Sequence, residues 1–257
     1  MPLLADDLLE CGQRTIVWAR TQLGPSGFAS ACDEILAHYK ATCAFVFAGR
    51  PDAAMNVADH LAQSFHRDGD FHANPRDPSA RIGGANYRNA WIVRGMHLLG
   101  RYELAAPGLA HLESQIDARI GGCRIVPSQW QGSDDLDFGT TCSAAIALLT
   151  ANNIASAKRC GNFLAGIVMQ QVPSGSRLLL RYRGDGTAIL PDTGVLAPTL
   201  IDANGPSDAQ LYWPLGMALV AFARLARATG DGAWQQPADA LLDFIDRCGP
   251  QVATHIT

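Results

Sequence analysis

The chain has 257 residues, of which 48% are apolar and 17% charged, and its formal net charge is −4. This composition excludes a disordered chain, because the apolar content suffices for a sizeable buried core. The basic residues form no stripe interleaved with aromatics, which argues against nucleic-acid binding. No apolar run reaches the ~18 residues of a membrane span, and the acidic start MPLLADDLLE is unlike a signal peptide. We therefore expect a single cytoplasmic globular domain over residues 1–257.

Helical periodicity runs through almost the whole chain and predicts an all-α fold. In chain order, the predicted helices span residues 4–22, 33–49, 52–66, 87–101, 104–117, 139–151, 154–171, 209–229 and 233–247. The one convincing strand signal is RLLLRYRGDGTAIL, in which Gly184-Asp185-Gly186 is expected to close a small hairpin. Short links with Gly or Pro join the helices, so consecutive helices should be antiparallel neighbours.

The predicted helices are of two alternating kinds. One kind is apolar or rich in small residues all round, as in YKATCAFVFAG, YRNAWIVRGMHLLG, GTTCSAAIALLTA and LYWPLGMALVAFARLA. Such helices should be buried on all sides. The other kind is amphipathic, as in DAAMNVADHLAQSF, ELAAPGLAHLESQI, IASAKRCGNFLAGIVMQQ and QQPADALLDFIDRC. Strict alternation of the two kinds predicts an inner ring of helices surrounded by an outer ring.

A degenerate repeat follows the amphipathic helices. The segments WARTQLGPSGFAS, LAQSFHRDGDFHA and LESQIDARIGGCRI share an amphipathic helix end, usually with Gln, then a polar link, a Gly and an apolar or extended residue. LAGIVMQQVPSGSRLLL is a looser fourth copy. This pattern resembles the QW-type motif of the α/α-toroid superfamily, which includes squalene–hopene and class II terpene cyclases, protein prenyltransferases and linalool dehydratase–isomerase. The stretches AWIVRGMHLLGRYELA and QLYWPLGMALVAFARLARATGD also resemble helix junctions of that group and of six-hairpin glycosidases. The resemblance implies an α/α toroid.

The number of predicted helices does not suit a complete ring. Six inner–outer pairs require twelve helices, whereas periodicity predicts about nine. The ring is then smaller, open, or completed by helices from a second copy. A free inner edge would expose an apolar groove, which a homodimer or an apolar ligand would cover.

Polar and aromatic residues gather where the predicted inner helices begin. The four starts are AHYKATC, GANYRNAW, SDDLDFGTTC and PSDAQLYW, and the helix bodies behind them are apolar. In a ring, these ends would together line the mouth of a central cavity. An apolar pocket with a few convergent polar groups is the usual form of a small-molecule site.

The acidic segment SDDLDFGTTC holds the first catalytic candidates, Asp135 and Asp137. Carboxylates this close raise one another's pKa, so one of them could stay protonated as a general acid. Their spacing resembles the DxDD acid motif of class II cyclases, although Phe138 stands where that motif has its last Asp. The alternative is that an Asp here only caps the following helix.

Two cysteines also lie near predicted inner-helix starts, Cys142 and Cys43. A helix N-terminus can lower a thiol pKa, while nearby carboxylates oppose this. Linalool dehydratase–isomerase uses Cys, Asp, His and Tyr around its cavity, so the resemblance makes Cys142 a catalytic candidate, with Cys43 and Tyr39 as substrate contacts. The alternative is that these cysteines are buried hydrophobic residues. The seven cysteines include no CxxC, and no metal or nucleotide motif is present, so no cofactor or metal is expected.

The remaining candidates are mostly aromatic. Aromatic faces stabilise carbocations and stack on sugars, and the candidates for such a wall are Tyr87, Trp91, Tyr212 and Trp213, with Gln210 beside them. Tyr87 is also a candidate base. In the second repeat, the Asp68-Gly69 turn is a structural joint. Asp70 and His72 follow it and are candidates for substrate binding and for a catalytic base.

Three functions are compatible with this pattern. The first is a terpenoid-cyclase-like enzyme that cyclises, isomerises or dehydrates an apolar terpenoid or polyketide-type molecule, by acid–base catalysis or by holding the substrate in a reactive conformation. The second is a six-hairpin carbohydrate hydrolase or lyase, with Asp70 and Asp137 as its carboxylate pair. The third is a non-catalytic, ring-shaped binding module.

Overall fold

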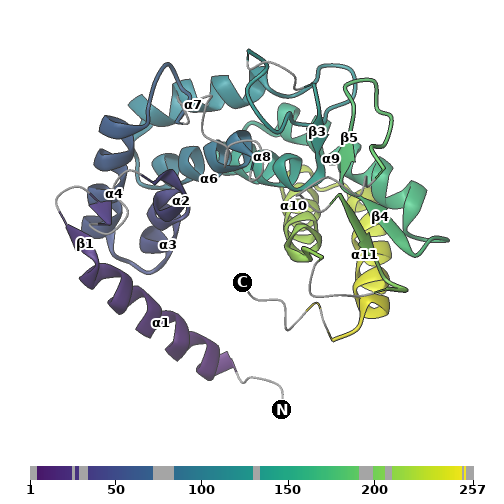
Figure 1. Cartoon of the computed structure of the whole chain (residues 1–257), viewed down its shortest axis with the longest axis horizontal. Coiled ribbons are helices and arrows are strands. Elements are labelled where there is room, and N and C mark those ends of the chain that lie inside the picture. Colours follow the sequence, from purple (N-terminus) through teal and green to yellow (C-terminus); the bar gives the residue numbers. More distant parts are fainter. Residues whose placement is uncertain are drawn as a thin grey trace. The chain divides into compact units, whose positions relative to one another are not determined.

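The computed structural model describes residues 5–24, 27–28, 34–71, 84–129, 134–190, 199–205, 210–250 and 252, and this part of the chain is mostly helical (Figure 1). The helices are α1 (Ala5–Thr21), α2 (Ile35–His38), α3 (Ala41–Phe47), α4 (Pro51–Ser64), α6 (Ala85–Leu98), α7 (Tyr102–Ser114), α8 (Phe138–Thr150), α9 (Ile154–Gln171), α10 (Trp213–Thr229), the 3₁₀ turn η1 (Gly232–Trp234) and α11 (Gln235–Cys248). The predicted helical class is therefore confirmed. None of these helices has the length and apolarity needed to cross a membrane.

The strands form three two-stranded antiparallel sheets. The pairs are β1 (Leu23–Gly24) with β2 (Gly27–Phe28), β3 (Leu136–Asp137) with β5 (Arg181–Tyr182), and β4 (Arg177–Leu179) with β6 (Leu200–Asp202). The predicted hairpin is present but short: Tyr182 bridges Ala188, and Arg183 N donates to Thr187 O at 2.8 Å. The sequence predicts none of the other pairings, because strands of two or three residues are too short to show an alternating pattern.

Two helices differ from their predicted spans. The predicted helix 33–49 is divided at Tyr39-Lys40 into α2 and α3, although Ala44 N still donates to Lys40 O. The division follows a tertiary contact, since buried His38 accepts a hydrogen bond from Phe28 N at 2.9 Å. The predicted helix 209–229 begins only at Trp213. Pro214 suits that first turn, because it has no amide hydrogen to leave unpaired.

The chain divides into two compact units. The first comprises Met1–Ala73 and Trp91–His111, and the second comprises Asn74–Ala90 and Leu112–Thr257. Each unit has its own buried apolar residues, such as Phe45 and Leu61 in the first and Phe138 and Phe222 in the second. One domain over residues 1–257 stays a prediction.

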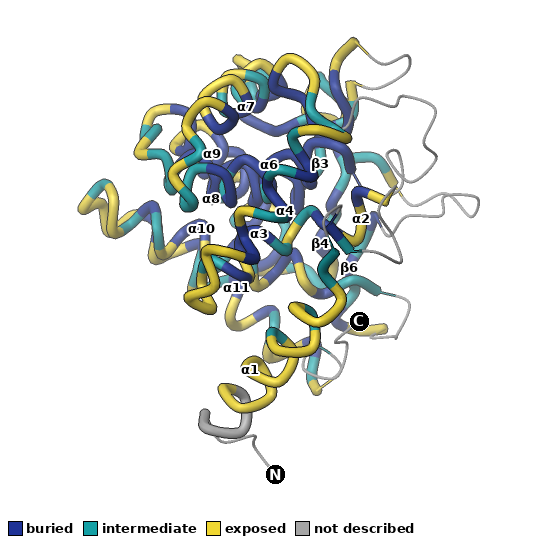
Figure 2. Tube along the Cα trace, turned by 90° about the vertical axis from the view of Figure 1, so that its left-hand side faces the viewer, coloured by how far each residue is buried: buried dark blue, intermediate teal, exposed yellow. Residues whose placement is uncertain are grey.

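Burial distinguishes α8 from the amphipathic helices α9 and α11 (Figure 2). All residues of α8 from Phe138 to Leu148 are buried, whereas α9 and α11 bury one face each. The prediction of all-round burial is wrong for α3, where Phe47 is 62% exposed. It is also wrong for α10, where Trp213 is 42% and Val220 46% exposed. Both residues lie on the helix face opposite buried Phe222 and Leu225, so the apolar pattern alone did not reveal which face has neighbours.

The glycines of the predicted repeat make similar contacts in different copies. Gly69, which follows α4, has a φ of +86°, and a Cβ there would lie 2.4 Å from Pro107 O in α7. Gly121, which follows α7, also has a φ of +86°, and a Cβ would lie 2.3 Å from Arg159 O in α9. In both copies, a glycine in a left-handed conformation lets the loop touch the backbone of the next amphipathic helix, which no other residue would allow.

The first and last copies of the repeat also contact the next amphipathic helix. Gly27, after α1, has a φ of +78°. A Cβ on Gly27 would lie 2.8 Å from Cδ2 of the His60 ring in α4. After α9, Arg247 of α11 donates hydrogen bonds to Gly175 O at 2.9 Å and to Val172 O at 2.7 Å. Each repeat loop thus contacts the next amphipathic helix along the chain.

The repeated Gln has a shared role in two copies. Gln115 at the end of α7 is 2% exposed, and its Oε1 accepts from Ser128 N at 2.8 Å. Gln171 at the end of α9 accepts from Leu179 N at 2.9 Å. In each case the side chain satisfies a backbone N–H of the segment that follows the helix, which explains why a Gln recurs there.

Candidate functional site

The N-terminal ends of α6, α8 and α10 meet in the second unit. A Cβ on Gly84, just before α6, would lie 3.3 Å from Thr140 Oγ1 in the first turn of α8. The rings of Tyr87 in α6 and Trp213 in α10 have centroids 4.9 Å apart. Trp213 also reaches α8, because a Cβ on Gly139 would lie 2.5 Å from its Cη2. The expected convergence is therefore found for three of the four predicted inner-helix starts.

Asp137 stands at the centre of this junction. Its Oδ1 accepts hydrogen bonds from Thr140 N at 2.6 Å and from Thr140 Oγ1 at 2.7 Å, so the capping role is confirmed. Its Oδ2 lies 3.1 Å from Arg181 Nε. The same Oδ1 would be 3.4 Å from a Cβ on Gly139, which the Trp213 ring also approaches. The carboxylate of Asp137, the guanidinium of Arg181 and the indole of Trp213 thus lie close together.

Sequence reasoning missed Arg181. It comes from β5, which pairs with β3 so that Arg181 stands opposite Asp137. Both side chains are 15% exposed, so the ion pair is largely withdrawn from solvent. The signal for Arg181 would have been the β3–β5 register, which no local pattern predicts.

The two candidate cysteines are buried. Cys142 is fully buried, and burial, with Asp137 and Cys160 adding to it, raises the pKa of its thiol well above the ordinary value. Burial also raises the pKa of Cys43 to about 11, although Arg94 opposes the change. The Cys43 Sγ donates to Trp91 O at 3.4 Å. These environments favour the packing role that the sequence left open, because a protonated thiol is a poor nucleophile or base.

Other predicted substrate contacts lie in the first unit. Lys40 Nζ is 5.3 Å from the ring centroids of both Tyr39 and Trp91, and Arg94 Cζ is 5.5 Å from the Trp91 ring centroid. These cation–π contacts bring Tyr39 and Trp91 together around a cation. Asp70 is 7% exposed, and its backbone pairs with that of Arg67. His72 lies outside the described residues.

The α10 candidates have structural roles. Gln210 accepts from Asp202 N and donates to Gly205 O, both at 2.6 Å, and is thereby tied to the end of β6. Tyr212 is the N-cap residue of α10 and is 3% exposed. Of this group, only Trp213 offers a partly exposed ring at the junction.

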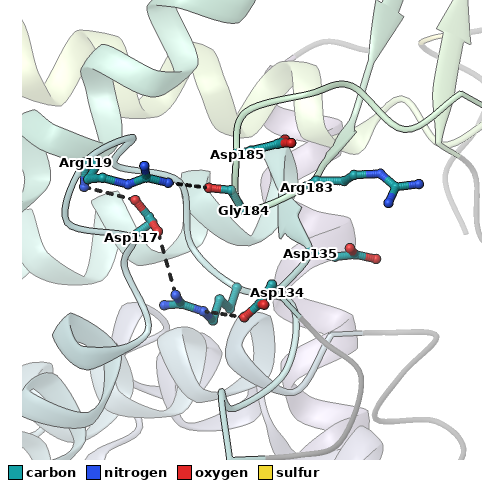
Figure 3. A pocket seen from close by; sticks show the side chains of 8 residues that line it. Asp117, Arg119, Asp134, Asp135, Arg183, Gly184 and Asp185 are labelled. Carbon is teal, nitrogen blue, oxygen red and sulfur yellow. Dashed lines mark hydrogen bonds and ion pairs between the residues drawn. The ribbon is translucent and has the colours of Figure 1, made fainter.

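A polar pocket of about 440 Å³ adjoins β3 and β5 (Figure 3). Apart from Gly184, its lining consists of charged side chains, namely Asp117, Arg119, Arg124, Asp134, Asp135, Arg183 and Asp185. Asp135, a predicted catalytic residue, therefore faces this pocket. No group of three or more His, Cys, Asp or Glu suited to a metal ion occurs within the described ranges.

No protein-family model matches the sequence, and no curated protein matches it significantly. Functional assignment therefore depends on the chemistry of the site.

Proposed function

We propose that the chain is an enzyme that cyclises, isomerises or dehydrates an apolar small molecule at the N-terminal ends of α6, α8 and α10. The observation that carries the proposal is the placement of Asp137 beside the Trp213 ring, which in turn contacts Tyr87. Aromatic faces attract a cationic centre, and a carboxylate beside them accepts the proton that such a centre releases. Cyclisation, isomerisation and dehydration through a cation all include that proton loss.

The roles of the residues follow from their contacts. Trp213 and Tyr87 form the wall against the substrate, and the Tyr87 hydroxyl donates the proton that generates the cation. Asp137 is the proton acceptor, because its hydrogen bonds from Thr140 and its ion pair with Arg181 are those of a carboxylate. This assignment replaces the general-acid role that the sequence offered as an alternative to helix capping. Arg181 is a positioning residue.

An α/α toroid is the fold that we propose for this enzyme. Its support is the repeat: loops after α1, α4, α7 and α9 each contact the next amphipathic helix. Alternation of these helices with others, such as the buried α8, suits an inner and an outer ring.

The experiment combines a thermal-shift screen with one variant. Purified protein is screened against isoprenoid and polyketide-like lipids and against neutral and uronic oligosaccharides, since any ligand of the native state raises the melting temperature. Asp137→Asn keeps a capping oxygen for Thr140 N but removes the charge. We expect a shift with the apolar panel in both proteins, and a loss of turnover of at least about 100-fold in the variant. Asp202→Asn, outside the junction, is the matched control.

Other outcomes would redirect the proposal. No shift with the apolar panel, together with cleavage of an oligosaccharide by the native protein, would overturn it in favour of a carbohydrate-active enzyme. Binding of the apolar panel without turnover by the native protein would favour a binding module. The homodimer also stays a prediction, which sedimentation velocity over a range of concentrations would test.

A further inference from the structure

We propose that the polar pocket of Figure 3 is a second binding site, which takes a neutral, polyhydroxylated ligand of the saccharide class. The proposal does not depend on the enzymatic function above. It rests on the charges of the lining, on two side chains that make no hydrogen bond or close ion pair, and on the fixed positions of the others.

Asp135 and Arg183 are the two lining side chains that could bind a ligand directly, although Arg183 also attracts the neighbouring Asp185 carboxylate. Continuing the β3–β5 register by one residue beyond the Leu136–Tyr182 pair places Asp135 opposite Arg183. Residues opposite each other in a sheet have neighbouring side chains on one face. Figure 3 shows both side chains extending to the same side. Yet across the described part of the chain, neither the Asp135 carboxylate nor the Arg183 guanidinium makes a hydrogen bond or an ion pair within 4.0 Å.

The opposite wall of the pocket is held in place internally. Asp117 Oδ1 accepts from Arg119 N at 2.9 Å and from Ile120 N at 3.0 Å, while its Oδ2 lies 3.7 Å from Arg124. Arg119 donates to Gly184 O at 3.3 Å, which ties this wall to the hairpin. The loop is anchored further by Gly121, which abuts the backbone of α9. A site whose walls are already ordered loses less entropy on binding.

The charge of the lining selects among ligands. Three Arg and four Asp give the lining a formal charge of −1, and acidic and basic side chains lie next to one another. A bare anion would meet the carboxylates and a bare cation would meet the guanidinium groups, so neither is favoured. An apolar ligand would leave these charges desolvated without partners. A hydroxyl group both donates and accepts, so adjacent hydroxyls can donate to Asp135 and accept from Arg183.

The size of the pocket is compatible with this class of ligand. Its volume of about 440 Å³ lies within the range of small-molecule sites, roughly 300–1,000 Å³. The lining has no aromatic ring, so affinity must come from hydrogen bonds alone. We therefore expect weak binding, with a Kd on the order of 1 mM.

The test uses three sugars that differ in charge. D-glucose, D-glucuronate and D-glucosamine, with maltose as a larger neutral probe, are titrated into the ¹⁵N-labelled full chain and followed by backbone amide shifts. We expect the neutral sugars to bind most tightly and to move the amide signals of residues 119–120, 135 and 183–185. Arg183→Gln and Asp135→Asn should each weaken binding about tenfold, because each removes a hydrogen bond to a charged group. Arg227→Gln and Asp243→Asn, on exposed parts of α10 and α11, are the matched controls and should leave binding unchanged.

Three results would overturn the proposal. The first is no saturable shift with any neutral sugar up to about 50 mM, far above the expected Kd. The second is equal or tighter binding of glucuronate or glucosamine. The third is binding that survives both pocket variants, or that moves the Trp213 signals instead of those of the pocket. The folding control is the amide spectrum of each variant without sugar. Away from the substituted residue, this spectrum should match that of the native chain.

Discussion

Arg181 Nε lies 3.1 Å from Asp137 Oδ2, and each side chain is only 15% exposed. An ion pair this far from solvent differs from a surface pair, because loss of one partner leaves the other charge poorly solvated. The pair also connects β5 to the first turn of α8, since Asp137 caps that helix through Thr140. The stability of the helix junction and the position of its carboxylate therefore depend on one guanidinium.

We expect Arg181→Gln to lower the free energy of unfolding by about 2 kcal/mol, through the unpaired carboxylate that it leaves. Arg177→Gln is the control: its partner Asp202 is at 2.7 Å, but Arg177 is 68% exposed, so the loss should stay below about 1 kcal/mol. Urea unfolding measures both. Equal losses would mean that the burial of Arg181 has no energetic consequence.

Gly139 tests the contact between α8 and Trp213. In Gly139→Ala, the new Cβ would lie 2.5 Å from Trp213 Cη2, so the partly exposed ring must move away. We expect a changed Trp213 indole N–H signal, assigned with Trp213→Phe, and little net change in stability. The helical preference of Ala, worth roughly 1 kcal/mol, offsets the displacement of the ring.

Gly216→Ala is the matched control in α10. A Cβ there has nothing within 4 Å, so the substitution should stabilise the protein by roughly 0.5–1 kcal/mol and leave the Trp213 signal in place. An unchanged Trp213 signal in Gly139→Ala would contradict the contact.

The sequence predicted those parts of the fold that depend on local pattern. The bodies of α4, α8 and α9 follow from apolar periodicity, and the Asp68-Gly69 turn follows from the need for a left-handed backbone, since Asp68 has a φ of 51°. The break after His38 was not predictable, because it depends on a hydrogen bond to Phe28, far from any helix pattern.

The candidate site was predicted to a similar extent. Asp137, Tyr87 and Trp213 were found because polar and aromatic residues cluster where apolar helices begin. Arg181 was missed because its role depends on the pairing of β3 with β5, which are distant in sequence. Asp135 was grouped with Asp137, yet it faces the polar pocket. Side-chain partners, unlike helix faces, cannot be inferred from spacing alone.

The buried position of Cys142 predicts its reactivity. Since burial raises the pKa of its thiol well above the ordinary value, Cys142 should resist iodoacetamide in the native protein at pH 8. Exposed Cys11 is the internal control and should be alkylated under the same conditions. Peptide mapping by mass spectrometry reads both sites, and in urea both should react. Native alkylation of Cys142 at the rate of Cys11 would restore it as a candidate nucleophile.

His38 makes the stability of the first unit depend on pH. Burial lowers the pKa of His38, with a smaller contribution from His60, while the hydrogen bond with Glu34 O opposes the change. The neutral ring is the bound form, because Nε2 accepts from Phe28 N at 2.9 Å and a protonated Nε2 could not. A base whose pKa is lowered on folding contributes stability above its unfolded value, near pH 6.5, and this stability is lost as the pH falls through the folded value.

We therefore expect the free energy of unfolding to fall between pH 7.5 and pH 5, and part of this fall to disappear in His38→Gln. His111 contributes in the same direction, because burial lowers its pKa too, with Asp70 opposing. The comparison is thus between the native chain, His38→Gln and His111→Gln, each unfolded in urea at several pH values. If His38→Gln retained the full pH dependence of the native chain, His38 would not be the titrating group, and its contact with Phe28 would have to survive protonation.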